Sequence, residues 1–444
     1  MSSPPSGGFR GRPYWGRGRG ATRGSSYSSS YRGASTDYIS LPSDKNIKEG
    51  LTATSLETLN IPYLTGTKTV RADVQNVEYI GSYNWIEARE PTIIVPGSPP
   101  EWTDPRPPIV LSPDSGTSFS DQNGFRIPSS TLLPLFAAVD SVAATTIDWP
   151  SIDFVTDRNG LRKLLRWIDG SATKDFRMDL EMAGTKTVLV NRWDKRQREA
   201  ANGKSFGYEF EKATTRAAKG CEMSTGHHRI IKYDFCGMKM VVRFEVDACL
   251  PTPRATTTAK QAVTAPSRSS SAQSPDDLAD ALAGLNIISS LPDVDDTSSS
   301  PDAKPRSSSI KIIHGGTEVP QESIMELATR SQYFIHEINW GEIFPQLFLS
   351  NTPHFYLGVH NRGRFDEIRK MELSGDELGS QREEAEVNFR KLGKALSTIQ
   401  EIVQKYGKER RVSLVCESGT LKVYERVGRK SCLPSGPEGV GRFE

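Results

Sequence analysis

The chain has 444 residues, of which 36% are hydrophobic and 25% are charged, and its formal net charge is +2 at pH 7. This length allows two or three average domains, but the low hydrophobic content indicates that part of the sequence does not fold. No apolar run approaches the roughly 18–20 residues of a membrane-spanning helix, and the first residues lack the pattern of a secretory signal. We therefore expect an intracellular protein with no membrane partner.

The cysteines indicate neither a disulfide framework nor a standard metal site. There are five of them, an odd number, and none forms a Cys-x-x-Cys pair. Cys221, His227, His228 and Cys236 carry side chains that bind zinc in other proteins, but their spacing fits no standard zinc pattern. We therefore expect free thiols in the core or in loops.

Positive charge is concentrated in a low-complexity segment at the start of the sequence. Residues 1–36 hold six arginines and no acidic residue, among many Gly and Ser residues and a few aromatic ones. With six positive charges here and +2 over the whole chain, the remaining residues carry a net charge of −4. This composition predicts a disordered tail over 1–37 that binds RNA non-specifically through arginine–phosphate contacts and stacking. A tail that only aids solubility or self-association is the alternative.

Between the tail and residue 150, the sequence predicts short strands separated by proline-marked loops. The best-defined strands cover 76–85 and 91–95. The segment 96–108 is too rich in proline for regular structure.

The next part of the chain predicts alternating helices and strands. Apolar residues at three- and four-residue intervals predict a helix over 158–168. Two segments, 176–181 and 186–193, predict a hairpin. A second helix over 205–219 carries Glu211, and a strand over 230–235 follows it.

A strand over 240–248 carries two carboxylates on one face. Glu245 and Asp247 lie two residues apart and point the same way, while Phe244 and Val246 point to the opposite face. Carboxylates this close repel each other unless a cation or a raised pKa relieves the repulsion, and Mg²⁺ prefers such oxygen ligands. The pattern therefore indicates a candidate metal site, and a solvated polar face of a strand remains the alternative.

A second low-complexity segment interrupts the folded part of the chain. Residues 251–309 are rich in Ser, Thr, Pro, Ala and Asp, which predicts a disordered insertion. Downstream, the sequence predicts a strand over 323–329, a segment over 346–357 that leads into another strand, a helix over 381–406, and a closing hairpin of 412–416 and 421–426.

Four short segments, taken in order, resemble the motifs of the DXO family of decapping exoribonucleases. They are Val-Thr-Asp-Arg158-Asn-Gly-Leu-Arg-Lys-Leu-Leu, Gly-Tyr-Glu-Phe-Glu211, Glu245-Val-Asp247 and Glu326-Leu-Ala-Thr. The resemblance implies an α/β (α+β) fold similar to that of the PD-(D/E)xK nucleases, with a mixed central sheet flanked by helices. It also implies that 38–250 and 310–435 are two parts of a single domain, with 251–309 inserted between them.

The resemblance further implies the roles of individual residues. Two divalent ions, Mg²⁺ or Mn²⁺, would be held by the carboxylates of Glu211, Glu245, Asp247 and Glu326 and by the backbone carbonyl of Leu327. Arg158 and Gln346 would contact the substrate, and Arg158 would act with the four carboxylates in catalysis.

The last motif departs from the family pattern. The family has Glu-x-Lys, whereas this sequence has Glu326-Leu327-Ala328. Losing one preorganised charged group of this kind commonly reduces the rate by about 10²–10³. Lys422 lies in Glu-Ser-Gly-Thr-Leu-Lys, where its spacing from the glutamate does not fit the motif. The sequence thus predicts that the metal ligands are kept and that catalysis is weakened.

The leading functional hypothesis is a metal-dependent hydrolase of RNA 5′ ends, which acts in decapping, as a pyrophosphohydrolase or as a 5′→3′ exoribonuclease. The alternative is a catalytically impaired module of the same fold that binds RNA ends or a partner nuclease. The resemblance implies RNA 5′ ends and an Xrn-type nuclear 5′→3′ exoribonuclease as partners, and favours the nucleus over the cytoplasm. The Asp-Asp-x-x-Asp pattern at 276–280 is typical of isoprenyl diphosphate synthases. It is disfavoured here because those enzymes are all-α and carry two such motifs.

Overall fold

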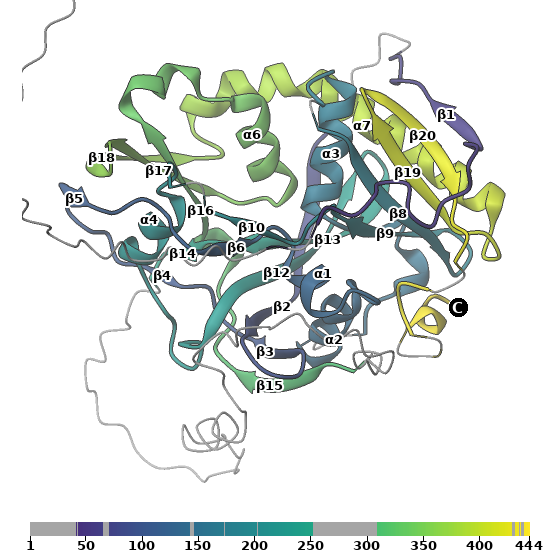
Figure 1. Cartoon of the computed structure of the whole chain (residues 1–444), viewed down its shortest axis with the longest axis horizontal. Helices are drawn as coiled ribbons and strands as arrows, with labels where there is room; N and C mark the ends of the chain where they lie inside the picture. Colours follow the sequence, from purple (N-terminus) through teal and green to yellow (C-terminus); the bar gives the residue numbers. More distant parts are fainter. Residues whose placement is uncertain are drawn as a thin grey trace, which may run out of the picture. The chain divides into compact units, whose positions relative to one another are not determined.

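Two large β-sheets form the frame of the protein (Figure 1). The computed structural model describes residues 41–251 and 309–444, apart from residues 42, 65–70, 143–145, 173, 202, 429, 430, 435, 437 and 438. The predicted tail, almost all of the predicted insertion and the Asp-Asp-x-x-Asp pattern lie outside the described residues, so the predicted division of the chain stays a prediction.

The larger sheet has eleven strands and is mixed. From one edge to the other they are β1 (Glu57–Leu59), β20 (Thr420–Glu425), β19 (Val412–Glu417), β8 (Phe176–Ala183), β9 (Thr187–Trp193), β7 (Phe154–Asp157), β13 (Met238–Val246), β12 (Ser224–Phe235), β2 (Val74–Ile86), β3 (Thr92–Pro96) and β15 (Lys311–Gly315). The central strand β7 runs parallel to both of its neighbours, and β15 runs parallel to β3. The other pairs are antiparallel.

The smaller sheet has seven strands. In order they are β11 (Thr215–Arg216), β4 (Glu101–Trp102), β14 (Ala248–Cys249), β16 (Ile324–Ser331), β17 (His354–Asn361), β18 (Arg364–Glu372) and β5 (Ile109–Val110). A separate pair of strands consists of β6 (Thr117–Phe119) and β10 (Arg198–Ala200). The chain passes from the larger sheet to the smaller one between β13 and β14, and the residue at this crossing is Asp247.

Helices cover both faces of the larger sheet. The α-helices are α1 (Gln122–Arg126), α2 (Leu133–Val142), α3 (Arg158–Ile168), α4 (Gly207–Thr214), α6 (Trp340–Leu349) and α7 (Gly379–Tyr406). Short 3₁₀-helices are η1 (Trp149–Ser151), η2 (Gln321–Ser323), η3 (Gln332–Glu337), η4 (Asp376–Leu378) and η5 (Val440–Phe443). Met240 and Val242 of β13 pack with α3, α6 and α7, whereas Val241 packs with α2 on the opposite face. This alternation is what a strand buried on both faces requires.

Most of the predicted elements are confirmed. The fold class is mixed α/β, α3 and α7 cover the predicted helices, and the predicted strands before residue 100 correspond to β2 and β3. The predicted mixed central sheet corresponds to the eleven-stranded sheet, and four of the strands after Asp247, β14, β16, β17 and β18, belong to the second sheet. An all-α isoprenyl diphosphate synthase fold is excluded by these sheets. None of the described helices is both long and apolar enough to cross a membrane.

The helix predicted over 205–219 is wrong at its C-terminal end. Helix α4 ends at Thr214, and Thr215 and Arg216 form β11 instead. The hydroxyls of Thr214 and Thr215 donate to the carbonyls of Phe210 and Glu211, at 2.7 and 2.8 Å. Side-chain bonds of this kind and β-branching weaken a helix, so the chain leaves it here and pairs with β4.

Candidate active site

The four predicted carboxylates meet where the two sheets join. Glu245 lies near the end of β13, Asp247 at the crossing, Glu326 in β16 and Glu211 in α4. The backbone amide of Leu327 donates to Asp247 Oδ2 at 2.8 Å, which places Asp247 beside the segment that carries Glu326. The sequence predicted this set of four, and the structure brings its members into one region.

The pKa values show how strongly these groups interact. Burial, and then the negative charges of Glu245 and Glu326, raise the pKa of Glu211 to about 8. Burial, followed by Glu326 and Glu211, raises the pKa of Asp247 well above its ordinary value. The pKa of Glu245 is also raised, by removal from bulk water and then by Glu326. Upward shifts with these causes are typical of carboxylates held together without a compensating cation.

A cavity of about 610 Å³ opens beside three of these carboxylates. Glu211, Glu245 and Asp247 lie in its wall, and we call it the carboxylate cavity. Lys212, the residue after Glu211, also lines it and forms no hydrogen bond or ion pair with the described residues. Sequence reasoning missed Lys212, although its position next to a predicted ligand was a signal. This cavity is large enough to take a nucleotide-sized group.

Arg158 and Gln346 both bind Glu326. Arg158 Nη1 donates to Glu326 Oε2 at 2.9 Å and to Ser350 Oγ at 3.2 Å. Gln346, in α6, donates to the other carboxylate oxygen of Glu326. The side chains of Arg158 and Glu326 are only 10% and 12% exposed. The two residues predicted to contact substrate therefore hold a carboxylate in place in this structure.

The donor set fits a divalent cation in its chemistry, but the side chains are not gathered around one point. Within the described parts of the chain, no group of three or more His, Cys, Asp or Glu side chains has the arrangement that holds a metal ion. Glu326 is bound to Arg158 and Gln346, and Asp247 is bound to the amide of Leu327. Glu326 and Asp247, which the other carboxylates repel, are thus held by hydrogen-bond donors. This finding also applies to the disfavoured zinc set, in which Cys236 is exposed and both histidines are buried.

The affinity for a divalent cation is expected to increase with pH between 4.5 and about 8. These are the ordinary pKa of Glu211 and its raised value. In this window the metal-free protein keeps a proton on Glu211 that a cation must displace. The same raised pKa makes the metal-free fold lose stability as the pH rises through the window. Calorimetric titration with Mn²⁺ in two buffers of different ionisation heat measures the released proton. A Glu211→Gln variant should lose this proton release, and an affinity independent of pH would contradict the expectation.

No lysine replaces the one missing from the last motif on β16. Ile324 and Ala328 contact the same hydrophobic cluster, whereas Met325 and Leu327 pack in another, on the α4 side. Because alternate residues of a strand share a face, Ala328 lies on the same face as Glu326. Lys422 is far from this strand in the fold, because it belongs to β20, at the β1 edge of the larger sheet.

A network of buried polar side chains lies beside Glu245, and the sequence analysis did not predict it. Arg243, on the same face of β13 as Glu245, donates to both carboxylate oxygens of Asp157 at 2.6 and 3.0 Å. Tyr83 stacks on His228, with ring centroids 5.0 Å apart. His228 is the cross-strand partner of Glu245. The alternation of β13 was the available signal, because it assigned Arg243 and Glu245 to one face.

A second, smaller pocket of about 210 Å³ adjoins the carboxylate cavity, and Glu245 lines both spaces. Four arginines line it, and we call it the arginine pocket; they are Arg158, Arg162, Arg192 and Arg243. Arg192 binds Asp194 at 2.5 Å and donates to the Ser120 carbonyl. The region next to the carboxylates is therefore rich in groups that bind phosphate.

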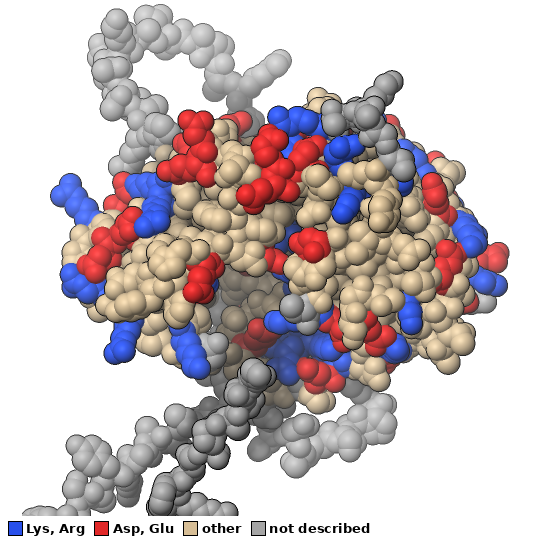
Figure 2. All heavy atoms as spheres, turned by 90° about the horizontal axis from the view of Figure 1, so that it is seen from above, with Lys and Arg blue, Asp and Glu red and all other residues tan. Residues whose placement is uncertain are grey.

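Charge on the outer surface is mixed. Figure 2 shows acidic and basic side chains interspersed over the face seen from above, with a hollow near its centre. The four arginines of the arginine pocket are therefore a local cluster of positive charge, in contrast to the mixed charge of the outer face in this view.

Comparison with known proteins assigns the chain to a family. A family model described as a domain of unknown function, DUF8563, matches residues 55–438. The chain belongs to this family. No curated protein matches the sequence of this DUF8563 protein.

Solved structures show which fold this DUF8563 chain has. It is similar to Rai1 of Scheffersomyces stipitis, solved with (3′-NADP)⁺ and a calcium ion, with 12% identity and a TM-score of 0.51 over 84% of this chain and 94% of that one. It is also similar to a mutant Rai1 of S. pombe solved with 3′-FADP, with 12% identity and a TM-score of 0.50 over 81% of this chain and 96% of that one. The predicted resemblance to the decapping family is thus confirmed for the fold.

Proposed function

We propose that this DUF8563 protein is a metal-dependent hydrolase of RNA 5′ ends. The observation that carries the proposal is that Glu211, Glu245 and Asp247 line one cavity and that the charge of Glu326 helps to raise the pKa of each of them. The Rai1 proteins of the same fold hold dinucleotides and, in one case, a divalent cation, which supports a nucleotide-containing substrate and a Mg²⁺ or Mn²⁺ cofactor here.

The residues of this chain have distinct parts in the proposed reaction. When bound, divalent ions would supply Lewis acidity and offset phosphate charge, and the four carboxylates with the Leu327 carbonyl would hold them. Arg158 lies within bonding distance of Glu326 and lines the arginine pocket, so it can pass from the carboxylate to a substrate phosphate. Gln346 keeps Glu326 oriented during this exchange.

The second candidate is a binding module that recognises RNA ends without cutting them. Two observations favour it: Ala328 stands where the family has lysine, and Arg158 is bound to Glu326. Such a module would assist an Xrn-type nuclear 5′→3′ exoribonuclease in mRNA quality control. For either candidate we propose a nuclear location and one folded domain built from 38–250 and 310–435, with 1–37 and 251–309 outside it.

The test is incubation of the full chain with RNA that carries a 5′-triphosphate, an unmethylated cap or an NAD cap, with Mg²⁺ or Mn²⁺. We expect release of the 5′-end group from at least one substrate, and loss of this activity in Asp247→Asn, which removes one of the charges that would bind the metal. The exposed Asp366→Asn variant is the matched control and should keep the activity. Binding of RNA ends with no release under any condition would reject the hydrolase and support the binding module.

A further inference from the structure

One stripe of arginines leads away from the carboxylate site along α3. Arg158, Arg162 and Arg166 are spaced four residues apart, so they lie on one face of the helix and rise about 6 Å from each to the next. Their side chains become steadily more exposed along the helix, at 10%, 18% and 33%. The stripe therefore starts beside Glu326 and emerges toward solvent.

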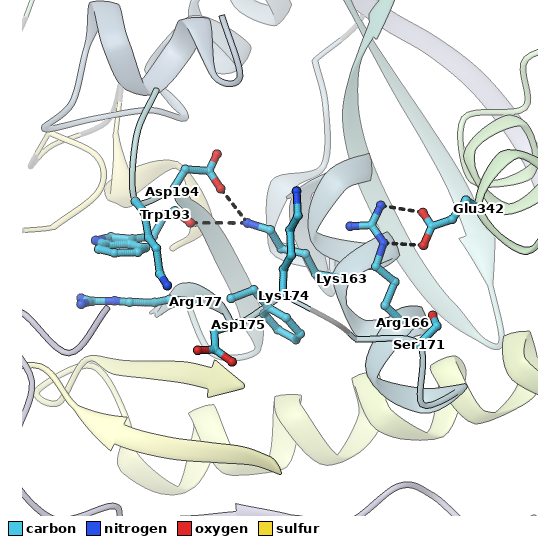
Figure 3. Close-up of a pocket in the computed structure, with 11 residues that line it drawn as sticks. Lys163, Arg166, Ser171, Lys174, Asp175, Arg177, Trp193, Asp194 and Glu342 are labelled. Atoms are coloured by element: carbon cyan, nitrogen blue, oxygen red, sulfur yellow. Dashed lines mark hydrogen bonds and ion pairs between the residues drawn. The ribbon is translucent and has the colours of Figure 1, made fainter. Parts of the chain in front are cut away.

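A pocket of about 350 Å³ lies at the outer end of this stripe. We call it the tryptophan pocket, because Trp193 lies in its wall. Figure 3 shows Trp193 and Asp194 on one side of it and Arg166 and Glu342 on the other. The two pockets are lined by neighbouring positions of α3 and β9, since Arg162 and Arg192 line the arginine pocket while Arg166 and Trp193 line this one.

The tryptophan pocket carries more positive than negative charge. Five cationic and three anionic side chains line it. Lys163 is bound to Asp194 at 2.9 Å, and Glu342 alone serves both Arg166, at 2.6 Å, and Arg162, at 2.9 Å. The exposed ammonium groups of Lys174 and Lys195 form no close salt bridge with the described residues, although the charge of Lys195 acts on Asp44. Because two guanidinium groups share one carboxylate and two lysines have no close salt bridge, cationic donors outnumber carboxylates around this pocket.

We propose that the arginine stripe and the tryptophan pocket bind the backbone of a single-stranded RNA whose 5′ end lies in the carboxylate cavity. The spacing of the stripe is close to the separation of neighbouring phosphates in an extended strand, and proteins that track such a strand combine a cationic groove with aromatic side chains. Arg158, the first arginine of the stripe, lines the arginine pocket together with Glu245. This position favours an RNA strand over an acidic peptide, because the carboxylates would repel the peptide. This inference rests on the proposed function for the position of the 5′ end.

The test compares the binding of two 5′-monophosphorylated oligouridylates, of three and ten nucleotides, to the full chain by fluorescence anisotropy in Ca²⁺. The exposed pair Lys174→Glu and Lys195→Glu should weaken binding of the longer strand about tenfold at physiological salt. It should also reduce the slope of log affinity against log salt by about 1.4, since two phosphate contacts are lost. Binding of the shorter strand should not change, because it does not reach the tryptophan pocket.

A control pair with the same change in charge, Lys311→Glu and Lys391→Glu, lies on β15 and α7 and should leave both affinities unchanged. Equal losses for both strands, or no loss for the longer one, would overturn the proposal. Capture of an acidic peptide by the pocket with RNA binding intact would overturn it as well and assign the pocket to a protein partner. If the wild-type chain hydrolyses no 5′ end, the proposed hydrolase function is wrong. The proposal that the tryptophan pocket binds RNA is still decided by the anisotropy measurement.

Discussion

Replacing Ala328 by lysine is expected to raise the rate of 5′-triphosphate RNA hydrolysis about 10²–10³-fold, the usual worth of one preorganised charged group. Ala328 lies on the same face of β16 as Glu326, so a lysine there would extend toward the carboxylates and a bound phosphate. Its ammonium group would stabilise negative charge that develops on phosphorus. The measurement is the single-turnover rate in Mn²⁺, with the Mn²⁺ affinity determined in parallel and expected to change little.

Two matched variants separate charge from bulk and from position. Ala328→Met fills a similar space without charge and should leave the rate unchanged. Thr329→Lys places the same charge on the opposite face of β16 and should also have no effect. A wild-type rate that no Ala328 substitution raises would show that another group already supplies the charge. Lys212 is then the residue to replace first, because it lines the carboxylate cavity without a partner in the described chain.

Replacing Asp157 by asparagine is expected to lower the free energy of unfolding by about 3–5 kcal/mol, because a buried cation would lose its compensating charge. The side chain of Arg243 is completely buried, and Asp157 accepts two of its hydrogen bonds, at 2.6 and 3.0 Å. Two further bonds, to the Thr131 carbonyl and to Tyr83, do not supply negative charge. Urea denaturation of the full chain measures the difference.

The exposed pair of Arg364 and Asp366 provides the control for this variant. Its partners are 3.0 Å apart, as close as many buried pairs, but both side chains are 55% exposed. Asp366→Asn should therefore change stability by less than about 1 kcal/mol. Similar small losses for both variants would mean that Arg243 obtains its compensation elsewhere in the network.

The sequence predicted the elements of the site better than their surroundings. The alternation from Met240 to Asp247 indicated correctly which side chains share a face, because strand geometry fixes this locally. It could not indicate that β16 comes beside Asp247, since this pairing joins segments far apart in the sequence. The same limit hid the bond between Arg158 and Glu326.

Helices α2 and α6 were not predicted, for two different physical reasons. Helix α6 contains Pro345, which normally ends a helix, and packing of Phe344 and Leu347 into the core overrides that preference. Helix α2 is apolar on nearly all sides because it is buried, so its sequence lacks the amphipathic period by which helices are recognised.

The order of strands in the larger sheet has a consequence for how this protein folds. Its edge strand β1 pairs with β20, so Glu57 meets Val423, and β8 pairs with β19 from the same late hairpin. Contacts between such distant parts of a chain give a high contact order and slow folding. During synthesis the hydrogen-bonding edge of β8 stays open until residue 412 and those after it have emerged. Until then the nascent chain exposes a strand edge that other chains can pair with, so it is open to aggregation while the residues between β8 and β19 are synthesised.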